Sequence, residues 1–176
     1  SDYFPVEQEY GYSVFSTVFY AEFVPTEFHA RYDVKSKTYE YRILNSHYSD
    51  PFEVNRAFHF SKHISDHDLI NMQKAAKAMC GTHDFSSFMA TGSKITDAVR
   101  TIYSCDVDRS GDIITVRISA DGFLYNMVRI ICGTLIEVAK NNISPEDITA
   151  IISSCNRRLA GPTLPPYGLY LVDVEY

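Results

Sequence analysis

The sequence has no tryptophan and only four cysteines among its 176 residues. The cysteines stand singly, with no C-x-x-C pair, which argues against a zinc site and a disulfide framework and favours buried thiols in a reducing compartment. They are Cys80, Cys105, Cys132 and Cys155. No apolar run reaches the length of a membrane span, and the first residues, SDYFPVEQEY, lack the basic start and the apolar core of a signal peptide. We therefore expect no membrane partner.

The patterns of several common enzyme classes are also absent. There is no phosphate-binding glycine loop, no G-x-S-x-G and no H-E-x-x-H. His63 and His67 are four residues apart, but a helix start expected at Ser65 lies between them, so we expect surface histidines and no metal site. The formal net charge of −6 argues against a general nucleic-acid binder, although a local basic patch is compatible with an acidic total.

What the chain does contain is an ordinary globular composition, 45% hydrophobic and 22% charged, with 13 tyrosines. Aromatic and β-branched residues predict the strands, and capping residues with apolar periodicity predict the helices. The expected strands are 14–24, 38–44, 55–60, the two strands of a hairpin over 100–119, and 169–176. The expected helices are 65–81, 123–140 and 144–155. This order predicts an α+β fold, a mostly antiparallel sheet with helices packed on one face.

One arginine interrupts the apolar pattern of the helix expected over 123–140. Read at 3.6 residues per turn, the stretch FLYNMVRIICG is apolar over most of its circumference, so this helix should be largely buried. A guanidinium keeps its charge, and when it is buried it needs an anion or several carbonyl partners. Arg129 therefore either serves a site or lies on the narrow polar side of the helix with Asn126 and Gly133 and reaches water.

Three stretches between firm elements are candidates to line a site, namely FHARYDVKSKTYEYR, GTHDFSSFMATGS and RRLAGPTLPPYGLYL. From the pattern alone, a turn followed by core aromatics is the favoured explanation of each. Taken together, however, these pieces resemble the type A tRNA pseudouridine synthases. The matching motifs are FHARY, K-x-Y-x-Y (Lys37, Tyr39, Tyr41), HDFSSF, VRTI, F-x-x-x-MVR-x-I-x-G, AGPT and GLYL, in the family's order and spacing from about Tyr20 onward.

The resemblance implies a cytoplasmic enzyme that isomerises uridine to pseudouridine in the anticodon stem-loop of tRNA, without metal or cofactor and usually as a homodimer. The target base is flipped into a cleft between two α+β halves of each subunit. The resemblance assigns residues 20–176 to the C-terminal α+β domain of such an enzyme, a pseudouridine-synthase-like catalytic half. It leaves residues 1–19 as an N-terminal arm of unclear origin.

The family's N-terminal catalytic motif, of the form GRTDxGVH, does not occur in the sequence. Its aspartate is the nucleophile, and neither Asp33 nor Asp84, the acidic residues nearest the matched motifs, can be promoted to that role. We therefore expect a chain that lacks the N-terminal half of the enzyme and is inactive by itself. The alternatives are a non-catalytic tRNA-binding or dimerisation module and a plain α+β interaction domain whose motifs are coincidental.

The resemblance also assigns roles to single residues. Arg129 is the arginine that pairs with the catalytic aspartate, Tyr39 packs its ring on the flipped uracil, and Leu169 forms the floor of the base pocket. We expect these three on one concave surface, with the guanidinium bound to water, to a carbonyl or to a carboxylate such as Asp84. The candidates for RNA contact, each with an ordinary surface or ion-pair role as its alternative, are Arg31, Lys37, Arg100 and Arg157.

Overall fold

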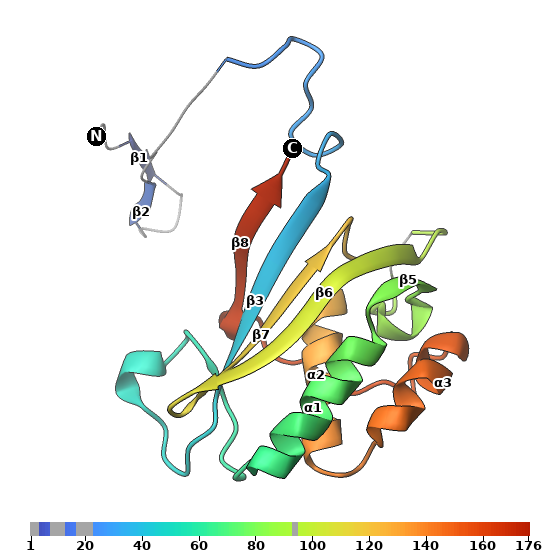
Figure 1. The fold of residues 1–176 in the computed structure, drawn as a ribbon. Helices are drawn as coiled ribbons and strands as arrows, with labels where there is room; N and C mark the ends of the chain where they lie inside the picture. Colours follow the sequence, from blue (N-terminus) through green and yellow to red (C-terminus); the bar gives the residue numbers. More distant parts are fainter. Residues whose placement is uncertain (1–3, 8–12, 17–22, 93–94) are drawn as a thin grey trace. The chain divides into compact units, whose positions relative to one another are not determined.

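The structure, a computed structural model, describes residues 4–7, 13–16, 23–92 and 95–176 (Figure 1). The chain divides into two compact units, residues 1–33 and residues 34–176. In the first unit, β1 (Phe4–Glu7) pairs antiparallel with β2 (Ser13–Ser16). Most of the strand expected over 14–24 lies outside the described residues, and the boundary expected between residues 19 and 20 stays a prediction.

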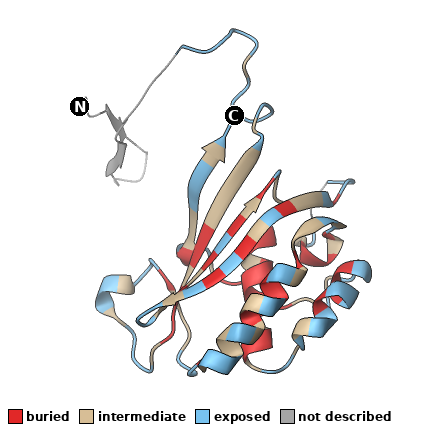
Figure 2. Ribbon diagram, viewed as in Figure 1, coloured by how far each residue is buried: buried red, intermediate tan, exposed pale blue. Residues whose placement is uncertain are grey.

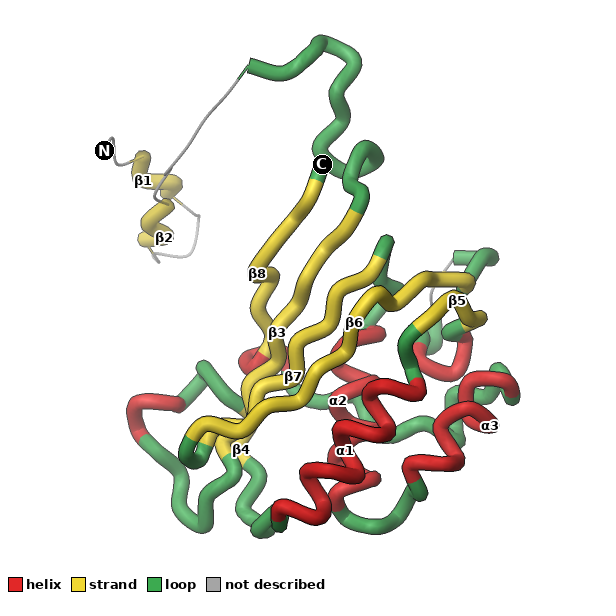
Figure 3. Tube along the Cα trace, viewed as in Figure 1, coloured by secondary structure: helices red, strands yellow, loops and turns green. Residues whose placement is uncertain are grey.

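The second unit is built on a six-stranded sheet with the order β4–β3–β7–β6–β5, in which β8 also pairs with β3 (Figure 3). Among the described residues, every pairing in this sheet is antiparallel except the short parallel one between β3 and β4. The expected mostly antiparallel sheet is therefore confirmed. The strands are β3 (Ser36–Leu44), β4 (Phe58–His59), β5 (Gly81–Asp84), β6 (Val99–Ser110), β7 (Ile113–Ala120) and β8 (Leu169–Glu175).

Two segments of the sheet differ from the sequence pattern. The strand expected over 55–60 shrinks to the two residues of β4. The segment before it forms a 3-10 turn over Pro51–Glu53, because a proline at the first position and the Asp50 cap, which accepts from the amide of Phe52, favour a helical turn. Conversely, the four residues of β5 have no strand pattern in the sequence. They form a strand because the fold places them beside β6, with which they pair antiparallel.

In the described part of the chain, three α-helices pack on one face of the sheet (Figure 1). The first, α1 (Asp66–Ala78), begins with the expected capping box, in which the side chains of Ser65 and Asp68 each accept from the other's backbone amide. The second, α2 (Met127–Ala139), begins four residues later than expected because Asn126 takes a left-handed backbone with φ of 62°. The third, α3 (Ile148–Ser153), follows a short 3-10 turn.

The core lies between α2 and the sheet. Eleven of the 13 residues of α2 are buried, and Figure 2 shows the buried positions gathered on this helix and on the strands that face it. On β3, Tyr41 and Ile43 point into this layer and are completely buried. Each fully buried aliphatic side chain contributes about 1.5–3 kcal/mol, so the burial of α2 fixes the helix firmly on the sheet.

The opposite face of the sheet is polar. Glu40, which alternates with Tyr39 and Tyr41 along β3, is only 7% exposed because two arginines cover it. Its carboxylate accepts from Nη2 of Arg117 at 2.9 Å and from Nε of Arg42 at 2.8 Å. These charged hydrogen bonds, chiefly the one from Arg117, hold the pKa of Glu40 below its usual value.

Candidate active site

A pocket of about 280 Å³ opens where the start of α2, the middle of β3 and the start of β8 meet. It is lined by Tyr39 from β3, by residues 123–129 from the segment that enters α2, and by Pro166 and Leu169 near the end of the chain. Its volume lies near the lower end of the range for small-molecule pockets, roughly 300 Å³ and upward. The structure thus brings together Tyr39, Arg129 and Leu169, and their catalytic roles stay a prediction.

Two aromatic rings form one wall of this pocket. The rings of Tyr39 and Phe123 meet edge to face, with centroids 5.0 Å apart and an interplanar angle of 89°. The next residue on the same face of β3, Tyr41, lies in the core and donates its hydroxyl to the carbonyl of Pro165 at 2.7 Å. The Tyr41 hydroxyl is protonated at neutral pH in any case, and burial raises its pKa, so this donor persists further into alkaline pH.

Arg129 enters the pocket from the first turn of α2 and is half-buried. Its Nε donates to the carbonyl of Leu164 at 2.5 Å, and its Nη1 donates to Oδ1 of Asn126 at 2.8 Å. Asp84 is not its partner, since that carboxylate accepts from the amide and the hydroxyl of Ser86. No ion pair among the described residues involves Arg129, so two neutral oxygens hold the guanidinium.

The loop that supplies the carbonyl of Leu164 is fixed by a close backbone crossing with α2. A Cβ atom on Gly133 would lie 1.8 Å from the carbonyl oxygen of Pro162, and one on Gly161 would lie 2.5 Å from the backbone of residues 133 and 134. The amide of Gly161 donates to Oγ1 of Thr134 at 2.9 Å. Two of the matched motifs thus carry glycine because their backbones touch.

Arg157 stabilises the same loop by donating hydrogen bonds to three of its oxygens. Its Nη1 donates to the carbonyls of Ala160 at 3.3 Å and Gly161 at 2.8 Å, and its Nη2 donates to Oγ1 of Thr163 at 3.2 Å. Burial lowers the pKa of the Arg157 guanidinium. The structure therefore gives Arg157 a role in shaping the pocket loop, and its contact with RNA stays a prediction.

The other basic candidates occupy different places. Lys37 lies on the same face of β3 as Tyr39, one side-chain repeat away. Arg100, at the start of β6, lies against Gly122, directly before the pocket segment, where a Cβ atom would be 3.4 Å from its Nε. Arg31 belongs to the first unit, residues 1–33. Two of these three thus lie on elements that lead to the pocket.

Sequence reasoning does not single out two of the pocket residues, Phe123 and Asn126. Read as helical positions, they belong to an apolar face and a polar face, with no role of their own. The available signal is the asparagine directly before an apolar run, because asparagine is favoured at the first boundary of a helix and tolerates the left-handed region.

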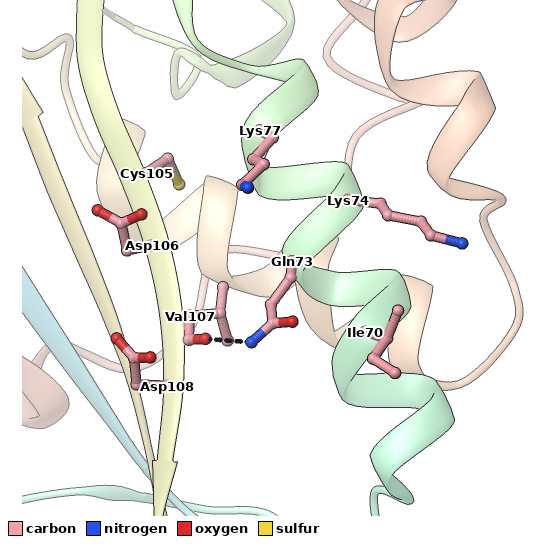
Figure 4. Close-up of a pocket in the computed structure, with 8 residues that line it drawn as sticks. All are labelled: Ile70, Gln73, Lys74, Lys77, Cys105, Asp106, Val107 and Asp108. Atoms are coloured by element: carbon pink, nitrogen blue, oxygen red, sulfur yellow. Dashed lines mark hydrogen bonds between the residues drawn. The ribbon is translucent and has the colours of Figure 1, made fainter.

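A larger hollow, of about 390 Å³, lies between α1 and β6 (Figure 4). Gln73 reaches from the helix and donates to the carbonyl of Val107 at 2.9 Å, which covers a backbone group on the free edge of β6. Lys74 points away from the strand, and Asp106 lies on the strand's far side from the helix. The polar groups do not converge, and none of the predicted site residues lies here.

Comparisons with known proteins identify the family of the chain. A family described as tRNA pseudouridine synthase matches residues 75–176, which include every pocket residue except Tyr39. The chain belongs to the tRNA pseudouridine synthase family. It is 45% identical over 153 residues to tRNA pseudouridine synthase A of Caldicellulosiruptor saccharolyticus, which covers 87% of this chain. It is 44% identical to tRNA pseudouridine synthase A 2 of Clostridium tetani and 42% identical to tRNA pseudouridine synthase A of Bacillus subtilis, over 156 residues and 89% of the chain in both cases.

The matched part spans 62% of the length of each of these three relatives. Within the described residues, no helix is both long enough and apolar enough to cross a membrane. The same residues contain no cluster of three or more side chains of the types that ligate metals.

Proposed function

We propose that this chain is the C-terminal, pocket-bearing part of an enzyme that isomerises uridine to pseudouridine in the anticodon stem-loop of tRNA. One observation carries the proposal. Tyr39, Arg129 and Leu169 come from an early strand, a long helix and the last strand, and they line a single pocket in a member of this family. Packing of the core alone does not require this convergence, whereas a pocket for a flipped base does.

In the proposed reaction, the target uridine leaves the base stack and enters the pocket. The ring of Tyr39, braced by Phe123, packs on the uracil, and the side chain of Leu169 supports it from the other strand. Isomerisation breaks the bond from C1′ of the ribose to N1 of uracil and forms a bond from C1′ to C5. C5 releases its proton and N1 takes one up, so the product is an isomer of the substrate. Tyr39, a half-buried residue that lines the pocket, carries the hydroxyl that we propose to assist at C5.

The nucleophile of the proposed reaction is an aspartate outside these 176 residues. Arg129 supports it, because an opposite charge at short range lowers the pKa of a carboxyl and keeps it ionised for attack. The guanidinium suits that role, since its present partners, the carbonyl of Leu164 and the side-chain amide of Asn126, leave its charge uncompensated. We propose accordingly that the isolated chain is inactive.

The proposal includes the setting of the whole enzyme. Its partners are tRNA, the N-terminal half and a second copy of the enzyme in a homodimer, its location is cytoplasmic, and it uses neither metal nor cofactor. The competing function is a tRNA-binding or dimerising module without catalysis.

Tritium release separates the two functions. The isolated chain, incubated with tRNA carrying tritium at C5 of uridine, should release no more tritium than buffer does, whereas the chain joined to the residues that its gene encodes upstream should turn over. A GRTD-type motif in that upstream sequence is expected. Turnover by the isolated chain would contradict the missing nucleophile, and inactivity of the joined protein would favour the binding module.

RNA contact is tested by replacing three basic residues with glutamine. Arg157 is left out because its loss would also loosen the pocket loop. The test variant replaces Arg31, Lys37 and Arg100. If each contacts a phosphate, filter binding of tRNA should weaken, and the slope of log affinity against log salt should flatten by about 2–3 units.

A charge-matched control replaces three exposed lysines with glutamine, none of which lines the pocket that contains Tyr39 and Arg129. They are Lys62, Lys74 and Lys77. This variant should bind tRNA with nearly the salt slope of the unmodified chain. Equal loss in both triple variants would show that only net charge matters, and the assignment of the patch would then be wrong.

A further inference from the structure

The backbone at Asn126 is unusual for the residue that begins a helix. An N-cap asparagine normally has an extended backbone, and its side chain accepts a hydrogen bond from an amide in the first turn. Asn126 instead has φ of 62° and ψ of 13°, and its side chain makes no capping bond to α2. A residue held in this region at the edge of a pocket points to a requirement other than helix stability.

The side chain of Asn126 is used by Arg129. Its Oδ1 accepts from Nη1 of Arg129 at 2.8 Å, while the carbonyl of Leu164 accepts from Nε at 2.5 Å. A planar guanidinium held at two of its nitrogens has a fixed orientation. Its third nitrogen, Nη2, donates no hydrogen bond within the described residues, and Arg129 lines the pocket.

We propose that Asn126 is a positioning residue, which fixes the guanidinium of Arg129 so that its Nη2 edge is offered to a carboxylate at the pocket. The proposal rests on the proposed function, in which that carboxylate is the nucleophile. Asparagine suits the position because it tolerates the left-handed backbone and accepts a hydrogen bond without neutralising the charge of Arg129. An aspartate would hold the same geometry but would itself pair with the arginine.

The experiment measures the orientation of Arg129 by ¹⁵N NMR of arginine side chains in the 176-residue chain. The signals of Arg129 are assigned by their loss in Arg129→Lys. In the unmodified chain, the hydrogen bond to Asn126 should slow rotation about the Nε–Cζ bond and keep the two Nη groups distinct. Asn126→Gly keeps the backbone relaxed but removes the acceptor, and rotation should become at least about tenfold faster, the lower end of what one hydrogen bond to a charged group provides.

Two matched variants separate positioning from a general structural effect. Asn126→Asp restores an oxygen at the same place, now with a negative charge, and should slow rotation at least to the unmodified rate. Asn55→Gly alters another left-handed asparagine, with φ of 60°, and should leave the Arg129 signals unchanged. Rotation unaffected by Asn126→Gly, not restored by Asn126→Asp, or equally faster in Asn55→Gly would overturn the proposal. Because no tRNA is used, these results are independent of whether the chain serves pseudouridine formation.

Discussion

Replacing Gly133 with alanine should disrupt the pocket loop from a distance. Gly133 lies inside α2, and a Cβ atom there would be 1.8 Å from the carbonyl oxygen of Pro162 and 2.9 Å from its carbonyl carbon. Both contacts are with backbone, so no side chain can rotate away. The distance from the new Cβ atom to this oxygen would have to grow from 1.8 Å to an ordinary contact of 3.4 Å. The two backbones must move apart for that, and the movement shifts the loop that carries Leu164.

The expected cost follows from three effects. Overpacking a tight contact costs about 1–3 kcal/mol, with the upper end applying where neither backbone can yield. Separation also breaks the hydrogen bond from the amide of Gly161 to Thr134, worth about 1 kcal/mol. Alanine regains about 1 kcal/mol through its higher helix propensity. The net loss in the free energy of unfolding should therefore be about 2–3 kcal/mol.

Urea unfolding followed by circular dichroism measures this loss. Gly122→Ala is the matched control, because its Cβ atom would meet only the flexible side chain of Arg100, at 3.4 Å, and its free energy of unfolding should change by less than about 0.5 kcal/mol. If Gly133→Ala is as stable as this control, the close crossing does not exist as described and the reasoning fails.

Three further results are expected. Glu40→Gln should lower the free energy of unfolding at pH 7 by about 1–2 kcal/mol through loss of the charged hydrogen bond from Arg117. Because the folded-state pKa of Glu40 is lowered from its ordinary value of 4.5, this stabilisation is present above that pH and should vanish as the pH falls through the folded-state pKa; a difference that persists in acid would contradict the pairing. Arg129→Met should change the free energy of unfolding by less than about 1 kcal/mol, since pocket water can reach the freed oxygens, and a loss above about 3 kcal/mol in urea titrations would show that the charge is needed for folding. Iodoacetamide at mildly alkaline pH should modify the exposed Cys155 and leave Cys132, whose pKa is raised by burial, unmodified until urea unfolds the chain, as mass spectrometry would show; equal labelling rates would contradict the buried thiol.

Much of the secondary structure depends on near neighbours and was predictable for that reason. The capping box at Ser65 and the hairpin before α2 involve residues close together in the sequence, so propensity and periodicity suffice. The burial of α2 follows from its apolar circumference. The start of α2 did not follow, since Asn126 contributes its side chain to Arg129 and not to a cap.

Other features depend on contacts between distant segments, which no local pattern contains. The four residues of β5 become a strand only because β6 lies beside them. The sequence leaves Arg157 open between RNA contact and an ordinary surface or ion-pair role, and only the folded loop shows the three oxygens to which it donates. Tyr39, Arg129 and Leu169 are predicted from the family resemblance. The sequence itself contains no physical reason for these three side chains to line one pocket.

The sequence by itself determined the class of fold, the burial of α2 and the family, because these depend on composition, periodicity and motifs. Only the tertiary structure decided the pocket. Its walls come from β3, α2 and β8, which meet because β8 pairs with β3 and because Gly133 and Gly161 let the loop before β8 touch α2. Backbone approach of this kind is a property of two segments together, and neither segment encodes it alone.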